Sequence, residues 1–314
     1  MARYREPPTA CRDAPNRNAR VSPIAILIAY LATLQVVFLV GYGVLVYVRR
    51  DRAARRNPTS RESPPLDDLA ASAHWWHRAQ AARLSGDVAR LGDRELLRQL
   101  LDDPHPAVQS AATASLAPLV DREVLGHLLD RLADRPMVVR LQQFALLKDT
   151  LPLTAPALLQ RLTADASPRK LKSWIALVET IGGPALFARV ASLHSHPDPL
   201  IRLSVARALK RYHDPEAEEM LLIALHDHDW RVRAVAARSL GTLGNTSAVS
   251  RLAAGMRDVR WWVRFRCGLA LAQLGDAGRM ALAEAGRDTD RYAGEMATMI
   301  GGLSPDSVQE LAEG

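Results

Sequence analysis

Hydrophobic residues recur with helical spacing through most of the chain. In the stretch "DHDWRVRAVAARSLGTLG" (227–244), Val232, Ala236 and Leu240 lie four residues apart, on one face of an amphipathic helix. Alanine and leucine are the dominant residues, and runs of β-branched residues are scarce outside one segment. The pattern therefore predicts an all-α fold.

This helix belongs to a unit that returns every 31 residues. Steps of 31 from Arg233 give Gln109, Arg140, Leu171, Arg202, Arg233 and Arg264. Six residues before each of these positions stand Asp103, Asp134, Asp165, His196, Asp227 and Asp258. Seven residues after them stand Leu116, Leu147, Val178, Leu209, Leu240 and Leu271. Such uniform columns indicate a repeat protein rather than a bias in composition.

Each unit has the pattern of two helices joined by a turn that holds the aspartate. In the unit around Trp230, Asp214 is expected to cap the first helix and Pro215 to occupy its first position. The second helix is expected to end at Gly241 or Gly244. Neither helix can bury its apolar stripe alone, so the pairs must stack into an α-solenoid with a continuous core.

A unit of this length, with Asp in the turn and Val-Arg shortly after it, resembles the short bacterial HEAT-like repeats, including those named after phycobilisome lyases. The resemblance covers Leu97 to Gly275 and is clearest in "DHDWRVRAVAARSLGTLG" and "RDVRWWVRFRCGLALAQLG". The third unit departs from it at Lys170 and Leu171, and the first unit has Gln109 in place of Arg. The resemblance implies the architecture but not the lyase activity, because function depends on a site and not on a repeat.

The domain organisation follows from the repeat and from one long apolar segment. We predict six to seven repeats preceded by one transmembrane helix. The predicted parts are a basic N-terminal tail (1–20), the transmembrane helix (21–48), a linker rich in Arg, Pro and Ser (49–65), an N-terminal cap or half repeat (66–96), the HEAT-like repeats (97–287), and a degenerate repeat with a C-terminal cap (288–314).

The charged residues of the repeat are expected to belong to the fold. Stacked helices lie about 8–10 Å apart, within reach of an arginine side chain. We therefore predict a structural ladder in which the arginine of one layer meets the aspartate of a neighbouring turn. Its members are Asp103, Asp134, Asp165, Asp227, Asp258, Arg140, Arg202, Arg233 and Arg264.

The apolar segment is long enough to cross a membrane. No charged residue occurs from Ile24 to Val48, a run of 25 residues, whereas about 20 are needed for a helix to span the hydrocarbon core. The core of a cleaved signal peptide is shorter, about 7–15 residues, so we expect a retained anchor. Six arginines follow the segment and five precede it, which favours a cytoplasmic solenoid on the inner or cell membrane.

Gln35 lies near the middle of this segment. Its amide can hydrogen-bond to a partner helix in the membrane, but a single Gln in a long span is also tolerated without a partner. Both interpretations stay open.

The net charge of +7 does not indicate nucleic-acid binding once it is divided along the chain. Residues 1–61 hold 11 arginines and three acidic residues, a net of +8, and the rest of the chain has a net of −1. Domains that bind phosphate backbones are usually basic overall. Arginines beside Trp230, Trp261 and Trp262 keep DNA binding as a minor alternative.

Candidate chemistry in the repeats is sparse. His194, His196, His226 and His228 occupy equivalent turns one layer apart, and whether they bind a metal is left open. The sequence lacks a Gly-x-Ser-x-Gly nucleophile motif and a phosphate-binding glycine loop. We expect no enzymatic activity, no cofactor and no nucleic-acid partner.

The expected function is that of a membrane-anchored scaffold or adaptor that presents a solenoid surface to a partner protein. Its candidate contacts are Trp174, Trp230, Arg238, Trp261, Trp262 and Arg266. The three tryptophans 230, 261 and 262 could instead fill gaps between layers. The alternative is an accessory subunit of a bacterial membrane enzyme, for example a glycosyltransferase, assembled partly through Gln35. A DNA-binding or metal-dependent enzyme is less favoured.

Overall fold

The computed structural model describes residues 65–87 and 91–313, and these form pairs of antiparallel α-helices. The first helix of each pair belongs to an outer row: α4 (Leu91–Leu101), α6 (Arg122–Arg131), α8 (Leu151–Arg161), α10 (Pro184–Ala191), α12 (Pro215–Ala224), α14 (Val249–Gly255) and α16 (Gly275–Ala285). The second belongs to an inner row: α3 (Trp75–Asp87), α5 (Pro106–Leu116), α7 (Met137–Asp149), α9 (Pro168–Ile181), α11 (Pro199–Leu209), α13 (Trp230–Leu243), α15 (Trp261–Gln273) and α17 (Arg291–Gly301).

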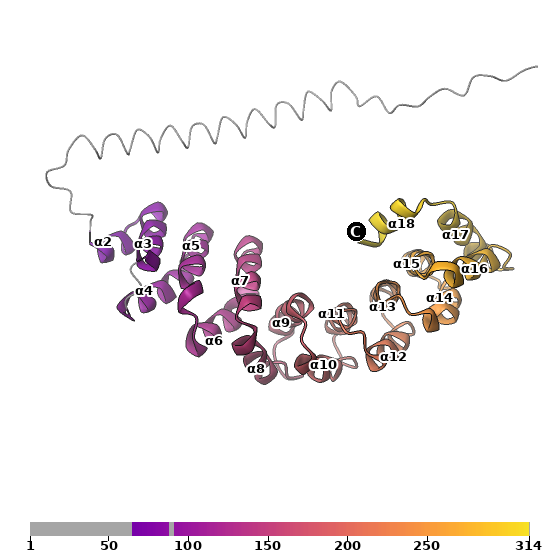
Figure 1. Ribbon diagram of the computed structural model, residues 1–314, viewed down its shortest axis with the longest axis horizontal. Helices are drawn as coiled ribbons and strands as arrows, with labels where there is room; N and C mark the ends of the chain where they lie inside the picture. Colours follow the sequence, from indigo (N-terminus) through magenta and orange to yellow (C-terminus); the bar gives the residue numbers. More distant parts are fainter. Residues whose placement is uncertain (1–64, 88–90, 314) are drawn as a thin grey trace, which may run out of the picture. The chain divides into compact units, whose positions relative to one another are not determined.

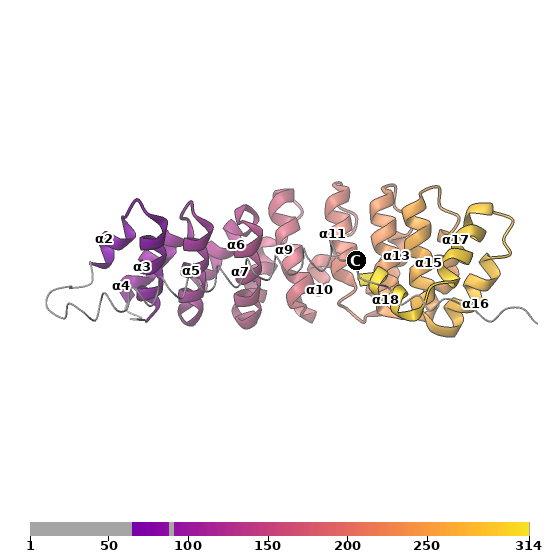
Figure 2. The same cartoon turned by 90° about the horizontal axis from the view of Figure 1, so that it is seen from above.

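Short elements complete this part of the chain. They are α2 (Leu66–Ala70) at its start, α18 (Pro305–Glu313) at its end, and the 3-10 turns η1 (Ala117–Leu119), η2 (Leu132–Asp134) and η3 (Thr246–Ala248). Within this unit the inner row lies on the concave side and the outer row on the convex side (Figure 1). Seen from above, the inner-row helices follow one another side by side (Figure 2). The predicted all-α solenoid is confirmed.

The predicted transmembrane segment, with Gln35, lies outside the described residues. Within residues 65–87 and 91–313, none of the helices combines the length and the apolar character that crossing a membrane requires.

Local sequence sets the helix ends. Asp214 caps α12 by accepting a hydrogen bond from the Glu216 N–H, and Pro215 occupies the first position of that helix, as predicted. Helix α13 ends at Gly244, whose φ of 78° is left-handed. Gly241 instead lies inside α13, where a Cβ would come within 2.8 Å of the Ala270 Cα on α15. This glycine therefore permits close approach of two inner-row helices rather than ending one.

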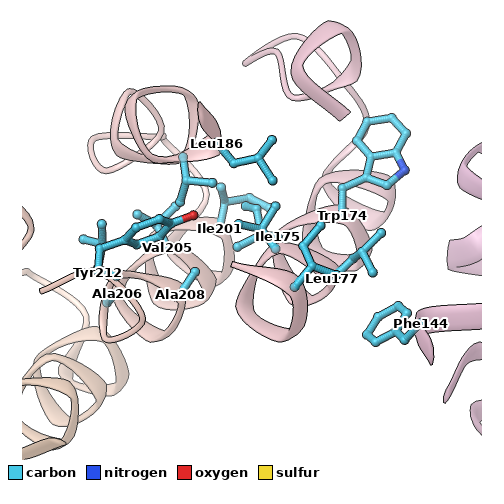
Figure 3. Close-up of a cluster of buried hydrophobic side chains, with 14 of the residues drawn as sticks. Phe144, Trp174, Ile175, Leu177, Leu186, Ile201, Val205, Ala206, Ala208 and Tyr212 are labelled. Atoms are coloured by element: carbon cyan, nitrogen blue, oxygen red, sulfur yellow. The ribbon is translucent and has the colours of Figure 1, made fainter. Parts of the chain in front are cut away.

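The apolar columns of the repeat form a continuous core between the rows. Leu116, Leu147, Val178, Leu209, Leu240 and Leu271 are all buried, with at most 1% of their surface exposed. Figure 3 shows how one layer joins the next: Phe144 of α7, Ile175 and Leu177 of α9, Leu186 of α10 and Ile201 of α11 meet in one cluster. Each layer therefore relies on its neighbours to exclude water from its apolar residues.

Candidate interaction surface

The predicted ladder forms at two of its positions as a two-pronged ion pair. The Arg202 guanidinium donates to both carboxylate oxygens of Asp227, each at 2.7 Å. Arg233 binds Asp258 in the same way, at 2.7 and 2.9 Å. These side chains are 12–17% exposed. In each case the arginine belongs to one inner-row helix and the carboxylate to the turn of the next layer.

The remaining guanidinium nitrogen binds the arginine's own turn. Arg233 Nη1 donates to the carbonyl oxygen of Asp227 at 2.8 Å, and Arg202 Nη1 donates to that of His196 at 2.9 Å. The paired carboxylate also accepts a backbone N–H two residues on, as Asp258 does from Arg260. We call each of these arginine–aspartate pairs a rung. A rung joins two consecutive turns and forms hydrogen bonds with backbone groups in both of them.

A further rung was missing from the sequence prediction. Arg78 of α3 donates to Asp103 at 2.6 and 3.0 Å, with the geometry of the other two pairs. Arg78 stands 31 residues before Gln109, so the repeat spacing contained the signal. The N-terminal helix α3 therefore carries the same arginine position as the later inner-row helices.

The ladder is interrupted in the middle layers, contrary to the prediction. Asp134 and Asp165 are exposed to solvent, and Arg140 has only the Met137 sulfur, at 3.5 Å, as a side-chain partner among the described residues. Gln109 stands where an arginine would reach Asp134, and Leu171 stands where one would reach His196; neither side chain can form the two-pronged contact. Asp134 pairs with Arg169 at 3.1 Å instead. Arg140 and Asp165 do occupy the two positions of one contact, but they do not pair in the described structure. Gln109 retains only the contact with its own turn, since its amide donates to the carbonyl oxygen of Asp103 at 2.7 Å.

Arg264 departs from the prediction at the last layer. Its Nη1 donates to the Asp258 carbonyl oxygen at 2.8 Å, but no carboxylate pairs with it in the described structure, and its buried Nε has no partner there. The carboxylate of the next turn is Asp288, one residue short of the 31-residue register, and it pairs with Arg257 instead. The Arg264 guanidinium lies over the Tyr292 ring, 5.1 Å from its centre.

The rungs control the ionisation of their aspartates. Burial acts against the charged form of Asp227, but the hydrogen bonds from Arg202 and from the Asp229 N–H outweigh it and lower the pKa of Asp227. The pKa values of Asp103 and Asp258 are lowered by the same balance of burial and hydrogen bonds. These carboxylates are therefore held in the charged form by the fold.

Large apolar side chains occupy the first two positions of several inner-row helices. Six of them are at least 40% exposed: Trp75, Trp76, Met137, Val138, Trp261 and Trp262. Because the inner-row helices are parallel, their N-terminal ends lie along one edge of the solenoid. We call these six side chains the aromatic edge. Trp230 occupies the equivalent position on α13 but is half-buried against the core.

The tryptophans of the aromatic edge are held by ring contacts. Trp75 stacks on His105 with ring centres 4.3 Å apart, and Trp261 stacks on Phe265 at 4.9 Å. Trp262 meets Trp261 edge to face at the same distance. These contacts fix the rings while leaving about half of their surface in water, so these tryptophans do not serve only to fill gaps between layers.

Trp174 is not a partner contact, contrary to the prediction. Only 4% of its surface is exposed, and its indole N–H donates to the carbonyl oxygen of Leu129 at 2.8 Å. Val205 and Ala236, which occupy the same position in the next two repeats, are also buried. This position of the repeat therefore faces the core, and the Trp174 ring lies between layers. Trp174 is therefore a packing residue with a satisfied polar atom.

The concave face of the inner row carries arginines. Each inner-row helix packs against its two neighbours and against the outer row, so its remaining face is the concave one. Exposed or half-buried arginines on this face are Arg169, Arg207, Arg231, Arg238 and Arg266. The predicted contacts Arg238 and Arg266 therefore share a surface, on the adjacent helices α13 and α15.

Helix α18 covers part of this surface. It packs against α15, and both views show it on the concave side of the inner row (Figures 1 and 2). Arg266 Nη1 donates to the Leu311 carbonyl oxygen at 2.8 Å. Val308 and Ala312, four residues apart, are each 8% exposed. The sequence predicted a C-terminal cap within residues 288–314, but not that its last helix lies on the surface that holds the candidate contacts Arg238 and Arg266.

The histidine side chains contact backbone groups in or next to their own turns. His196 replaces the ladder aspartate, and its Nδ1 accepts the Asp198 N–H at 3.0 Å. His194 and His226 each place Nδ1 near a backbone carbonyl oxygen of the preceding helix. Within residues 65–87 and 91–313, no cluster of three or more His, Cys, Asp or Glu side chains is arranged to hold a metal ion.

Several solved structures are similar to this chain. Human deoxyhypusine hydroxylase, in complex with glycerol, is 20% identical, with 78% of this chain and 96% of that chain covered and a TM-score of 0.33. The complex of CpcE and CpcF of phycocyanin lyase from Nostoc is 17% identical, with coverages of 80% and 100% and a TM-score of 0.33. YibA from Escherichia coli is 16% identical, with coverages of 78% and 93% and a TM-score of 0.41.

No curated protein sequence matches this one. The family model for HEAT repeats matches residues 63–147 and 218–299. These two segments together make up more than half of the 314 residues, and they contain both members of the Arg78–Asp103 and Arg233–Asp258 pairs. The chain belongs to the HEAT-repeat family.

Proposed function

We propose that this protein is a membrane-anchored scaffold that binds a partner protein along the inner row of its solenoid. The observation that carries the proposal is the aromatic edge. Tryptophan, methionine and arginine are enriched at protein interfaces, and rigidly held tryptophans often supply most of the binding energy. Here Trp75, Trp76, Trp261 and Trp262 are exposed and held by ring contacts, and Arg266 follows Trp262 by one turn of α15.

The anchor is proposed from the sequence. The uncharged run from Ile24 to Val48 has the length of a transmembrane helix. Between this run and Pro65 stand 16 residues, which span at most roughly 55 Å when extended. The solenoid would therefore stay near the membrane surface, on the cytoplasmic side of the cell membrane, and would meet its partner there at a raised effective concentration.

We further propose that the protein has no catalytic activity of its own. The support is that its recurring charged and imidazole side chains serve the fold. Arg202, Arg233 and Asp227 bind one another or backbone groups, and His196 Nδ1 accepts the N–H of Asp198, the capping residue of α11. Residues repeated at each layer of a solenoid generally stabilise the stack.

The test is site-specific photocrosslinking in the full-length protein, in native membranes. A photoreactive residue at position 262 samples the aromatic edge. The same residue at position 280 is the control, because Met280 is 73% exposed but belongs to the outer-row helix α16. We expect one defined protein adduct from position 262 that is absent from position 280. Equal adducts from both positions, or none from position 262, would contradict the scaffold proposal.

The accessory-subunit alternative makes a different prediction. If the membrane helix carries the assembly, Gln35→Leu should abolish copurification of an integral membrane enzyme in mild detergent. Paired Trp261→Ala and Trp262→Ala substitutions should then leave copurification unchanged. The scaffold proposal expects the opposite pattern.

A further inference from the structure

The C-terminal helix α18 occupies a surface that is otherwise suited to a partner. It lies on the concave face, beside α15 and near α13 (Figures 1 and 2). The surface beneath it includes Arg266, which binds the Leu311 carbonyl oxygen. The carbonyl groups at the C-terminal end of a helix lack intrahelical partners and carry partial negative charge. A guanidinium at this place therefore recognises the end of a helix.

We call the surface beneath α18, which includes Arg266 and Arg238, the seat. Its charge favours a negative ligand. Burial lowers the pKa of Arg266, and the nearby charge of Arg238 lowers it further. Arg238 and Arg266 lie on the adjacent helices α13 and α15, so the site that holds the Leu311 carbonyl oxygen is positively charged and favours an acidic ligand. The segment 304–314 matches this requirement, since it contains Asp306, Glu310 and Glu313 and no basic residue.

The contact of α18 with the surface is small. The helix has 9 residues, too few to be stable alone in water. Val308 and Ala312 are its buried apolar residues, whereas Leu311 is 39% exposed. A cleft of about 540 Å³ remains open beside the first turn of α18, between it and helices α13, α15, α16 and α17, and is bordered by Thr242, Gln273 and Val308. At this end of the contact there is therefore room for a helix that is longer or bulkier than α18.

We propose that α18 is a displaceable occupant of this seat, and that the seat binds an acidic amphipathic helix of the partner protein in its place. The inference rests on the proposed scaffold function and adds the chemistry of the partner and a means of regulation. Because α18 follows α17 after only a few residues, it competes at high effective concentration. A partner helix must therefore bind more tightly than α18 or join contacts elsewhere on the inner row.

The experiment uses full-length protein in detergent and a fluorescent peptide with the sequence of residues 303–314. Val308→Asp places a charge on the buried face of α18 and should release it. Met280→Asp introduces the same charge at an exposed apolar position of α16 and is the matched control. Hydrogen exchange of the α18 amides reports release directly, and exchange in α15 reports whether the solenoid stays folded.

We expect the peptide to bind the Val308→Asp protein about tenfold or more tightly than the native protein or the Met280→Asp protein, because α18 no longer competes. Adding Arg266→Ala to Val308→Asp should remove this binding. A peptide with its three acidic residues changed to Lys should not bind. The proposal is overturned if the released seat fails to bind the acidic peptide at up to ~1 mM, or binds the Lys peptide equally well.

This outcome is separate from that of the scaffold proposal. Crosslinks from position 262 with no peptide binding would remove only the seat and its regulation by α18. Peptide binding without any crosslink from position 262 would remove the aromatic edge as a partner surface.

Discussion

The contact between Arg233 and Asp258 permits a quantitative test of the ladder. Replacing Arg233 by Ala removes two hydrogen bonds to the carboxylate, at 2.7 and 2.9 Å, and the bond to the Asp227 carbonyl oxygen at 2.8 Å. Asp258 keeps the Arg260 N–H as a donor. Breaking one side of a buried ion pair costs about 3–5 kcal/mol, and an exposed pair is worth about 0.2–1 kcal/mol.

Arg233 and Asp258 lie between these limits, since their side chains are 14% and 13% exposed. We therefore expect Arg233→Ala to lower the free energy of unfolding by about 2–4 kcal/mol. For a unit of this size, that corresponds to a fall in Tm of roughly 5–15 °C if it unfolds as a whole. Because repeats are stabilised by their neighbours, increased amide exchange should concentrate in α13 and α15.

The matched control is Arg140→Ala. Arg140 occupies the same repeat position but has no carboxylate partner in the described structure, so its replacement should cost less than about 1 kcal/mol. Thermal unfolding followed by circular dichroism measures both variants. A double-mutant cycle with Asp258→Ala isolates the pair. Equal destabilisation by Arg233→Ala and Arg140→Ala, or no coupling in the cycle, would refute the ladder.

The same rung predicts a dependence on pH. The folded-state pKa of Asp258 lies below its ordinary value of 3.8, because the Arg233 and Arg260 hydrogen bonds outweigh the effect of burial. The stabilisation is therefore fully present above pH 3.8 and is lost as the pH falls through the lowered pKa. The difference in Tm between native protein and Arg233→Ala should shrink across this acidic range. A difference that stays constant would show that the carboxylate charge is not involved.

Three further predictions concern the packing of the solenoid. Gly241→Ala should destabilise the protein by about 1–3 kcal/mol because its Cβ would meet α15, whereas Gly301→Ala, with nothing within 4 Å of the new Cβ, should be neutral or stabilising; Tm measurements on both would show whether close approach is the cause. Trp174→Phe removes the indole N–H and one of its two rings, so the Leu129 carbonyl oxygen loses its donor and a cavity is left; chemical denaturation should show a loss of about 1–3 kcal/mol, and an unchanged midpoint would contradict the contact. Cys267 is fully buried and burial raises the pKa of its thiol to about 12; mass spectrometry should find it unmodified by iodoacetamide at pH 8 until the protein is unfolded, and rapid labelling of native protein would disprove its burial.

Repeat spacing alone was enough to predict much of the ladder. The positions of Arg202, Arg233, Asp227 and Asp258 in the 31-residue register led to the pairs that the structure contains. The same register, extended one step towards the N-terminus, would have given Arg78. Periodicity works here because stacking places equivalent residues of successive layers side by side, so that a position in the repeat is also a position in space.

Side-chain exposure could not be predicted from periodicity. Trp174, Trp230 and Trp262 look alike in the sequence as large aromatics on second helices, yet they are buried, half-buried and exposed, respectively. The difference arises from their places on the helix. Trp230 and Trp262 belong to the first turn, at the edge, whereas Trp174 lies on the face that meets the preceding layer.

The class of fold, the two-helix unit, the residues that cap its helices and the apolar columns of the core could all be predicted from the amino-acid sequence. They follow from local rules, namely helical period, capping residues and a repeat that each layer shares. Only the folded structure shows where the ladder stops, which tryptophans stay exposed to water, and that α18 folds back onto the inner row beside Arg266. These depend on contacts between residues of different layers, often made by single side chains that depart from the repeat, and such contacts leave no periodic signal in the sequence.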